Sequence, residues 1–409
     1  MTLIERLKDF TSNEAISMHV PGHKNNTIGD LNDLLTFNFD MTEIKGLDNL
    51  HDPVEVLKDL NGFLSNKTPG YFAQAMVNGT TNGILSAIFA LSKECQTFVL
   101  YGDIHKSIYH ALDLVSASYE IITKEELFNY DYSDKALIIT SPNYEGNILE
   151  NISSLVSYVH DRNGYVLVDS AHGAHLSITE NFPEAAYLSK ADIIVESYHK
   201  MLPALTMASV IFVKEERLYN EVMTFINYFE TSSPSYLIMA SIESAQQFYN
   251  NYKDGLFFKR RKKLIEHLNQ QGISVKEADD PCKLLLNWQH GPYALEDSLI
   301  NENIYAEMTT DSGVLFVLPL WHEGDCYPYS QLLDRLERLC LIKNENNQDK
   351  DISNLLGKVC VQNVVPYPPG IPLVLKGEIF TEADLKQLQQ YLFNHVKIEG
   401  IDYNINYYV

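Results

Sequence analysis

Short apolar runs recur between residues 97 and 213 of this 409-residue chain, and their spacing restricts the fold more than any other feature. Helical patterns, such as residues 152–161, separate the runs. The strand-like runs are residues 97–101, 136–140, 165–168, 192–195 and 209–213. Such runs are typical of strands buried on both faces, and their alternation with helices favours a mainly parallel sheet covered on both sides. The sequence therefore predicts an α/β fold.

The chain is longer than a single core of ordinary size, so we expect more than one domain. The alternation of helix and strand occupies residues 56–275, which we expect to form a large domain. Residues 1–55 are rich in Asn, Asp, His and Gly and are typical of an arm. Residues 276–409 contain shorter strand and helix patterns, which predict a smaller α+β domain.

The chain carries 31 basic and 54 acidic residues, a net charge of −23. This excess of acid argues against a nucleic-acid partner and favours cationic small molecules. No run of 18 apolar residues occurs, so no membrane partner is expected. The five cysteines contain no Cys-x-x-Cys pair. They indicate free thiols in a reducing cytoplasm, with neither disulfides nor a zinc site.

Two charged residues follow two of the apolar runs, where each strand would end. Asp169 comes directly after residues 165–168, and Lys200 lies shortly after residues 193–195. Open α/β sheets place their chemistry at these strand ends. A neighbouring aspartate and lysine suit pyridoxal phosphate (PLP), which needs an amine for its aldehyde and a carboxylate beside its ring nitrogen. The ordinary alternatives are a solvated surface lysine and an aspartate that caps a turn or helix.

A glycine turn earlier in the chain offers a seat for a phosphate group. Gly79, Thr80 and Thr81 lead into residues 84–91, whose composition suits a buried helix. The start of a helix has free NH groups and the positive end of the helix dipole. Gly-Thr-Thr is also an ordinary helix cap, so the motif alone is weak evidence for a phosphate site. Its position in the chain before Asp169 and Lys200 strengthens that interpretation.

Further motifs stand in the same order around these residues. They are His19-Val20-Pro21-Gly22-His23-Lys24, Leu50-His51-Asp52-Pro53, Asn78-Gly79-Thr80-Thr81, His105-Lys106-Ser107, Asp169-Ser170-Ala171-His172-Gly173, residues 197–206, and Pro368-Pro369-Gly370-Ile371-Pro372-Leu373. Together they resemble the ornithine/lysine/arginine decarboxylase family of fold-type I PLP enzymes, over roughly residues 15–380. The resemblance implies a mainly parallel seven-stranded sheet flanked by helices, with a smaller C-terminal domain. It implies the short form, which lacks a receiver-like N-terminal domain.

The resemblance also implies roles for individual residues. Lys200 would bond to the cofactor and move protons, and Asp169 would keep the ring nitrogen protonated. His105 would lie flat over one face of the ring, with Ala171 against the other. His199 would contact the cofactor beside Lys200. The remaining implied cofactor contacts are Gly79, Thr80, Thr81, His172, Ser197, Thr231 and Ser232, and the arm residues His23 and Lys24 are candidates for lining the site.

The substrate side of the site is implied in the same way. Glu378 matches the family's glutamate that contacts the distal cation, but Lys376 stands where a proline is usual, and its charge would weaken cation binding. Thr231 and Ser232 resemble an element that reaches the neighbouring subunit's site, and Thr231 would also contact substrate. We therefore expect a homodimer with shared active sites, and leave higher oligomers open.

The implied reaction is decarboxylation of arginine, lysine or ornithine in polyamine metabolism. The sequence does not choose among the three, because one methylene changes binding by only about 1–3 kcal/mol. The alternatives are an aminotransferase or lyase on the same scaffold, or a catalytically silent relative used for binding. His172 and His175 are spaced as a zinc pair, but no third ligand follows at a convincing spacing, so we expect no metal.

Overall fold

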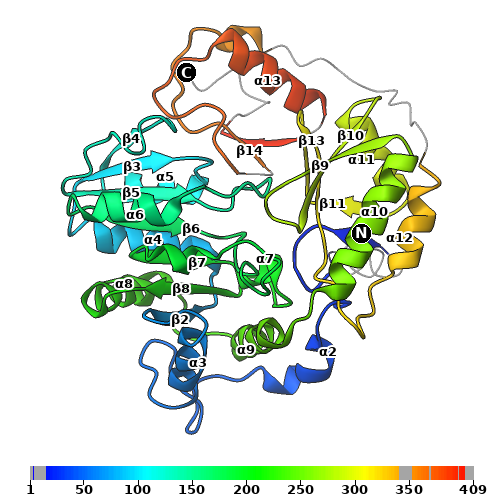
Figure 1. Ribbon diagram of the computed structural model, residues 1–409. Coiled ribbons are helices and arrows are strands. Elements are labelled where there is room, and N and C mark those ends of the chain that lie inside the picture. The colour runs from blue at the N-terminus through cyan, green and yellow to red at the C-terminus, as the bar shows by residue number, and fades with distance from the viewer. Residues whose placement is uncertain (1–2, 4–14, 340–351, 368–369, 395, 401–409) are drawn as a thin grey trace.

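A seven-stranded sheet lies at the centre of the computed structural model, which describes Leu3 and residues 15–339, 352–367, 370–394 and 396–400 (Figure 1). Its strands are, in spatial order, β2 (Phe72–Met76), β8 (Ser209–Val213), β7 (Ile193–Glu196), β6 (Tyr165–Asp169), β5 (Lys135–Thr140), β3 (Thr97–Tyr101) and β4 (Ser118–Ile121). Strand β8 runs antiparallel to both of its neighbours, and the other adjacent pairs are parallel. The predicted mainly parallel sheet is confirmed.

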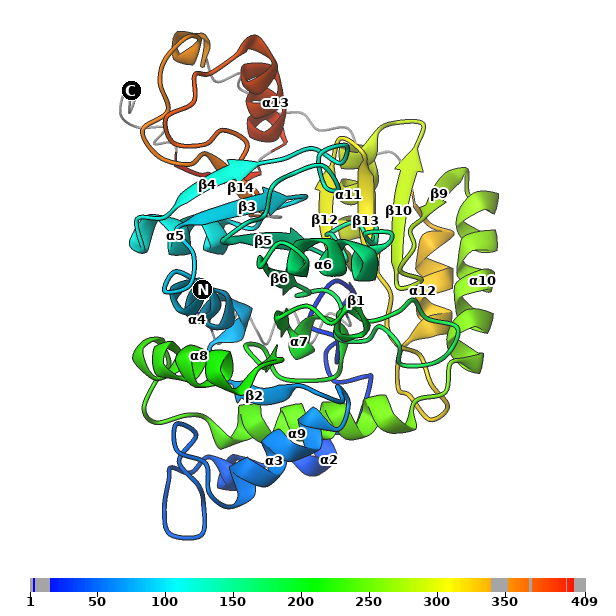
Figure 2. The same ribbon diagram turned by 60° about the vertical axis from the view of Figure 1, so that its left-hand side comes forward.

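Helices cover both faces of this sheet, because successive side chains of each strand point to opposite sides. In β3, Phe98 and Leu100 join a buried cluster with one helical layer, and Val99 joins the cluster on the other face. The first layer is α4 (Gly79–Leu91), α5 (Lys106–Leu114) and α8 (Glu216–Phe229). The opposite layer is α3 (Val56–Ser65), α6 (Ile152–His160) and α9 (Tyr236–Asn251), as Figure 2 shows.

A second, antiparallel sheet stands beside the first. Its order is β12 (Met308–Thr310), β13 (Gly313–Val317), β10 (Lys283–Trp288) and β9 (Ile273–Glu277). The helices of this part are α10 (Gly255–Gln270), α11 (Pro292–Asn301) and α12 (Tyr329–Leu336). The arm is attached here, because β1 (Ile16–Met18) pairs in parallel with β11 (Ile304–Ala306). The same apolar cluster continues from the large sheet into this part, so the two pack as neighbours.

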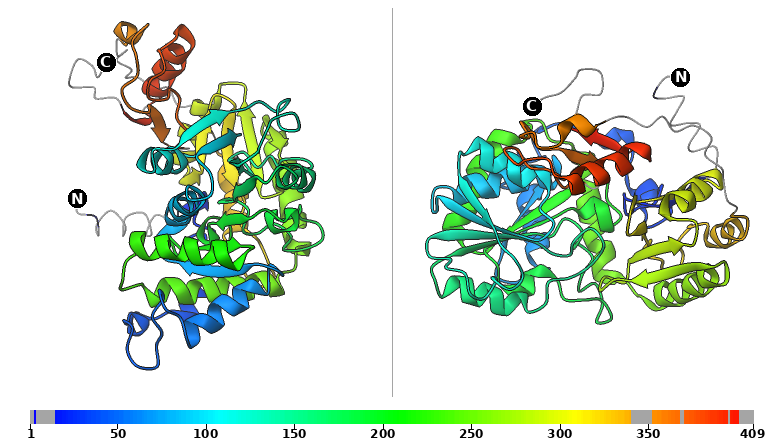
Figure 3. Two further views of the ribbon diagram at one scale, coloured as in Figure 1. Left: turned by 90° about the vertical axis from the view of Figure 1, so that its left-hand side faces the viewer. Right: turned by 90° about the horizontal axis from the view of Figure 1, so that it is seen from above.

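The C-terminal segment forms a separate small cluster that includes Val364, Val374, Leu388 and Ile398. Its elements are η3 (Ser353–Leu355), β14 (Val365–Tyr367), α13 (Glu382–Phe393) and β15 (Lys397–Glu399). Figure 3 shows it on the β3–β4 side of the molecule. The remaining short elements are α2 (Leu31–Leu34), η1 (Phe37–Phe39), η2 (Ala186–Ser189) and α7 (Tyr198–Met201). The expected domain bounds at residues 55 and 275 stay a prediction.

No helix in the described part of the chain combines the length and the apolar character that crossing a membrane requires.

Candidate active site

Lys200 lies in α7, a single turn that begins directly after β7. Its Nζ is 3.3 Å from Nε2 of His172 and 5.5 Å from the centre of the Tyr144 ring. Burial lowers the pKa of Lys200, and the positive charge of Lys283 acts in the same direction, while Asp169 opposes both. The shift favours the neutral amine, which is the form that attacks an aldehyde.

Asp169 is the last residue of β6, the strand next to β7. Its side chain is buried, and Oδ1 accepts a hydrogen bond from the amide of Ala171 at 3.1 Å. Burial raises the pKa of this carboxyl, and the charge of Lys200 and the Ala171 amide oppose the rise. A buried carboxylate needs a positive or hydrogen-bonding partner, which suits a protonated ring nitrogen.

His105 is the N-cap of α5, and its Nδ1 accepts from the amide of Ser107 and lies 2.8 Å from the Ser107 hydroxyl. Burial first, and then the charges of Lys200 and Lys106, lower the pKa of His105 to about 3, so the ring is neutral. A Cβ atom at Gly370 would lie 3.1 Å from Nε2 of His105, and the φ of Gly370 is +88°. The C-terminal segment therefore comes close to His105 at a position that favours glycine.

The predicted phosphate seat lies at the start of α4, where Gly79 adopts a φ of +74°. The hydroxyl oxygens of Thr80 and Ser197 are 3.1 Å apart, so the start of α4 meets the loop that carries Lys200. Thr81 is exposed in the next position of the helix. The two hydroxyl groups and the free first-turn amides of this 13-residue helix are groups that can bind an anion.

A small hollow of about 30 Å³ gathers the principal residues. Of the predicted residues, it is lined by Thr80, His105, Asp169, Ala171, His172 and Lys200. The other lining residues are Ile84, Thr140, Pro142 and Tyr144. An amine, a carboxylate, a flat neutral imidazole, a small alanine and a hydroxyl fit the groups of PLP. A larger hollow of about 490 Å³, between Asp30, Phe248 and His322, shares none of these residues.

Several predicted residues lie outside this hollow. His199 is held by its Nδ1, 2.9 Å from the carbonyl of Ala208, and burial lowers its pKa to about 4. Thr231 and Ser232 are exposed. Glu378 is also exposed, and its carboxylate accepts from the amide of Leu375 in its own turn. Pro368 and Pro369 lie outside the described residues.

The arm reaches the Lys200 loop through its backbone. The amide of Gly22 donates to the carbonyl of His199 at 2.7 Å. Lys24 is buried instead against the second part, where Nζ donates to the carbonyls of His19 and Val317. Burial lowers the pKa of Lys24 to about 7. In the single chain neither His23 nor Lys24 lines the Lys200 hollow.

Comparison with known proteins decides the family. Residues 2–122 and 119–289 match the model of the Orn/Lys/Arg decarboxylase major domain, and residues 340–399 match the model of that family's C-terminal domain. The chain belongs to the Orn/Lys/Arg decarboxylase family. It is therefore a PLP-dependent amino-acid decarboxylase.

Similar proteins come from several bacteria. An uncharacterized Bacillus subtilis protein, YaaO, is 29% identical, over 94% of this chain and 92% of its own. The Bacillus subtilis arginine decarboxylase is 23% identical, over 96% and 94%. Among solved structures, the Escherichia coli constitutive lysine decarboxylase has a TM-score of 0.64 at 17% identity, over 89% of this chain and 73% of that one. The Francisella novicida lysine decarboxylase has a TM-score of 0.66 at 17% identity, over 90% and 74%. These structural likenesses support the fold-type I architecture.

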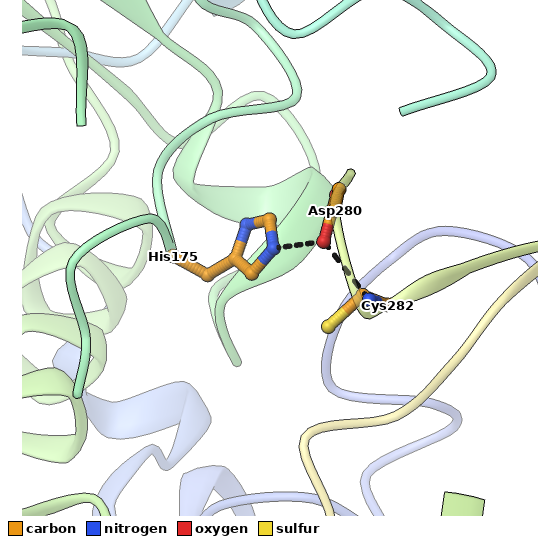
Figure 4. Close-up of side chains that lie close together, drawn as sticks. All are labelled: His175, Asp280 and Cys282. Carbon is orange, nitrogen blue, oxygen red and sulfur yellow. Dashed lines mark hydrogen bonds and ion pairs between the residues drawn. The ribbon is translucent and has the colours of Figure 1, made fainter. Parts of the chain in front are cut away.

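Sequence reasoning missed Tyr144 in the Lys200 hollow and several residues that contact its neighbours. Tyr144 follows β5 and could have been found by the strand-end rule that found Asp169. Lys283 and Asp280 lie far along the chain, beside His172 and His175, where only the tertiary fold brings them. Figure 4 shows Asp280 and Cys282 next to His175, and the three offer ligand-type atoms within 4.8 Å of one another. The Oδ1 atom of Asp280 already accepts from the Cys282 amide at 2.9 Å, and lies 2.8 Å from Nε2 of His175.

Proposed function

We propose that this decarboxylase converts a basic amino acid, arginine, lysine or ornithine, into the corresponding amine and carbon dioxide. The observation that carries the proposal is an acidic hollow of about 470 Å³ that shares Tyr144 with the Lys200 hollow. Asp103, Glu145 and Asp311 contribute carboxylates to its lining. A cationic side chain extending from an amino acid held at Lys200 would meet these carboxylates, and the net charge of −23 attracts such substrates.

Five residues of the Lys200 hollow would have tasks in this reaction. PLP, when bound, supplies an electron sink for the pair left on the α-carbon as carbon dioxide departs. Asp169 would hold the proton on the ring nitrogen. Lys200 would hold the cofactor through Nζ and return a proton to the α-carbon, so that a C–H bond replaces the lost C–C bond. His105 and Ala171 would fix the plane of the ring, and Tyr144 would restrict access of water.

The lining of the two hollows favours decarboxylation over amino transfer. An aminotransferase typically holds the substrate carboxylate with a bidentate arginine. Among the described residues that line either hollow, none is an arginine. A carboxylate without such a clamp can stand out of the ring plane and leave.

The finer expectations belong to the same proposal. Thr231, Ser232 and Glu378 are exposed on the single chain, which is where residues that serve a neighbouring subunit's site would lie. We therefore keep the homodimer with shared sites, and the distal-cation role of Glu378, as part of the proposal. We also keep a cytoplasmic location and a role in polyamine metabolism as part of the proposal, because the products would be diamines or agmatine.

The test is to incubate the purified holo-protein with each of the three amino acids and to identify the products. We expect one of them to yield carbon dioxide and its amine in equal amounts. Asp311→Asn and Asp103→Asn should each raise KM about tenfold or more, because a charged contact is worth about 1.5–3 kcal/mol. Asp334→Asn, an exposed acid on α12, is the matched control and should leave KM unchanged. Keto acid formation, or equal turnover of neutral amino acids, would contradict the proposal.

A further inference from the structure

A line of three side chains, Lys283, His172 and Lys200, leads from the second sheet to the Lys200 hollow. Lys283, the first residue of β10, places Nζ 2.9 Å from Nδ1 of His172. The other nitrogen of that imidazole, Nε2, lies 3.3 Å from Nζ of Lys200. The ring of Tyr144 packs on the imidazole with 4.9 Å between ring centres. His172 is thus held on three sides, and Lys283 is the contact that comes from outside the large sheet.

A second contact, between His175 and Asp280, lies beside the contact between His172 and Lys283. His172 and His175 are three residues apart, as are Asp280 and Lys283, and Nε2 of His175 lies 2.8 Å from the Asp280 carboxylate (Figure 4). The amide of Lys283 donates to the carbonyl of Asp280, so the segment is a tight turn. We call residues 280–283 the latch turn. Each of its two charged side chains contacts one histidine of the loop after β6.

The turn after β5 fixes the latch turn in place. The amide of Asp280 donates to the carbonyl of Gly146 at 2.9 Å. A Cβ atom at Gly146 would lie 2.6 Å from Cγ of Lys283, so the backbone of this turn packs closely against the aliphatic part of the lysine side chain. Lys283 is fully buried. Its ammonium group therefore has little freedom to choose another partner.

The chemistry of the two groups decides how the imidazole is protonated. An ammonium group has three donors and no acceptor, so it can bond to Nδ1 only if that nitrogen carries no proton. A neutral imidazole must then carry its single proton on Nε2, which faces Lys200. The shorter contact lies on the Lys283 side, as expected if that bond is charge-assisted.

We propose that Lys283 is a positioning residue that fixes His172 in the tautomer with its proton on Nε2, so that His172 donates toward Lys200 and the cofactor atoms bonded there. The cofactor part of this inference rests on the proposed function. The tautomer of His172 does not depend on the cofactor, because Lys283 is part of the chain.

The electrostatic surroundings agree with a neutral His172. Burial, and then the charges of Lys200, Lys283, His175 and His199, keep the pKa of His172 well below its usual value. Burial also lowers the pKa of Lys283, but Asp280, Glu307 and Cys282 oppose this and favour the ammonium form. Lys200 has its own opposing partners in Asp169 and Glu307.

The latch turn explains the nearby group of His175, Asp280 and Cys282 better than a metal ion does. The facing atoms of His175 and Asp280 are already at hydrogen-bond distance. Lys24 and Lys283 place positive charge beside Cys282, which would repel a cation.

The direct test measures the His172 tautomer in the chain without cofactor. Long-range proton–nitrogen correlation spectra distinguish a bare from a protonated ring nitrogen, and His172→Gln identifies the signal. We expect a bare Nδ1 and a protonated Nε2 in the unmodified chain. A protonated Nδ1 would overturn the proposal, and this result needs no variant that might fail to fold.

Variants then test whether Lys283 is responsible. Lys283→Met keeps the stem and removes the donor, and should shift the His172 signal toward a mixture of tautomers. In the holo-protein it should move the pH midpoint of the cofactor's visible absorbance by about one unit, a tenfold change in the equilibrium. Lys276→Met, an exposed lysine on β9, should change neither.

An unchanged tautomer in folded Lys283→Met would overturn the role of Lys283. Failure of the proposed function would look different, because the expected tautomer would be present while no amine or carbon dioxide is released. Thermal unfolding of each variant separates a loss of positioning from a loss of the fold.

Discussion

Nζ of Lys67 lies 2.7 Å from Oε2 of Glu196, and both side chains are buried. The same ammonium donates to the carbonyl of Ala174 at 2.9 Å. Glu196 ends β7, four residues before Lys200 in α7, and Ala174 belongs to the loop that follows Asp169. One cation therefore ties together the two strand ends that carry Asp169 and Lys200.

Removing the Lys67 ammonium should destabilise the protein strongly. In Lys67→Met the Glu196 carboxylate is left buried without its counter-ion, which typically costs about 3–5 kcal/mol. Lys67→Met combined with Glu196→Gln should recover part of this loss, because no buried charge remains unpaired. Urea unfolding measures both free energies. Lys93→Met, which breaks an exposed pair with Glu221, is the control and should cost less than about 1 kcal/mol.

The contact between the arm and the Lys200 loop predicts that Gly22 tolerates no side chain. A Cβ atom there would lie 2.5 Å from the carbonyl oxygen of Leu202, a backbone atom that cannot turn away. Gly22→Ala should cost about 1–3 kcal/mol and displace α7. Gly62→Ala, in an open position of helix α3, should gain up to about 1 kcal/mol from helix propensity. Equal melting temperatures for the two variants would contradict this account.

Glu230 predicts a pH-dependent part of the stability. Burial raises the pKa of this carboxyl from 4.5 to about 7, although Oε1 accepts from the amide of Val77. The folded state thus binds more protons than the unfolded state between these values. The share of the free energy of unfolding that depends on protonated Glu230 is fully present below pH 4.5. It is lost as the pH rises to 7, which lowers the stability by about 3 kcal/mol.

Glu230→Gln keeps an acceptor for the Val77 amide and cannot ionise. The variant should therefore be more stable than the unmodified chain at pH 8, and the difference should vanish near pH 4.5. Denaturant unfolding at the two pH values checks the sign. A variant that is less stable at pH 8 would show that the carboxylate is favourably held.

Much of the large sheet follows from the sequence, because its central strands are continuous apolar runs. The predicted strands at residues 97–101 and 209–213 match β3 and β8. The runs predicted for β5 and β6 differ by one residue at one end, and the run predicted for β7 is shifted by one residue. The edge strand β4 was missed because all of its side chains are exposed and give no apolar run. β2 was missed because alanine and a buried glutamine give little strand propensity.

The site could be predicted where the chemistry lies at a strand end. Asp169 ends a strand of the large sheet, and Lys200 and His105 each follow one, so the fold brings them into one hollow. Lys283 could not be found this way, because it begins a strand of another sheet and reaches His172 only through tertiary packing. The sequence also could not predict that Glu378 is exposed, because the resemblance implies only that this residue contacts the substrate.

The central claim is that the cofactor bonds to the half-buried Lys200 and to none of the buried lysines. Among the described residues the buried lysines are Lys24, Lys67 and Lys283, so the claim is selective. The measurement is to load the purified chain with PLP, reduce it with borohydride and locate the pyridoxyl group by peptide mass spectrometry. The account predicts a single label on Lys200 and none in Lys200→Ala. A label on Lys24, Lys67 or Lys283, or an unlabelled chain, would contradict it.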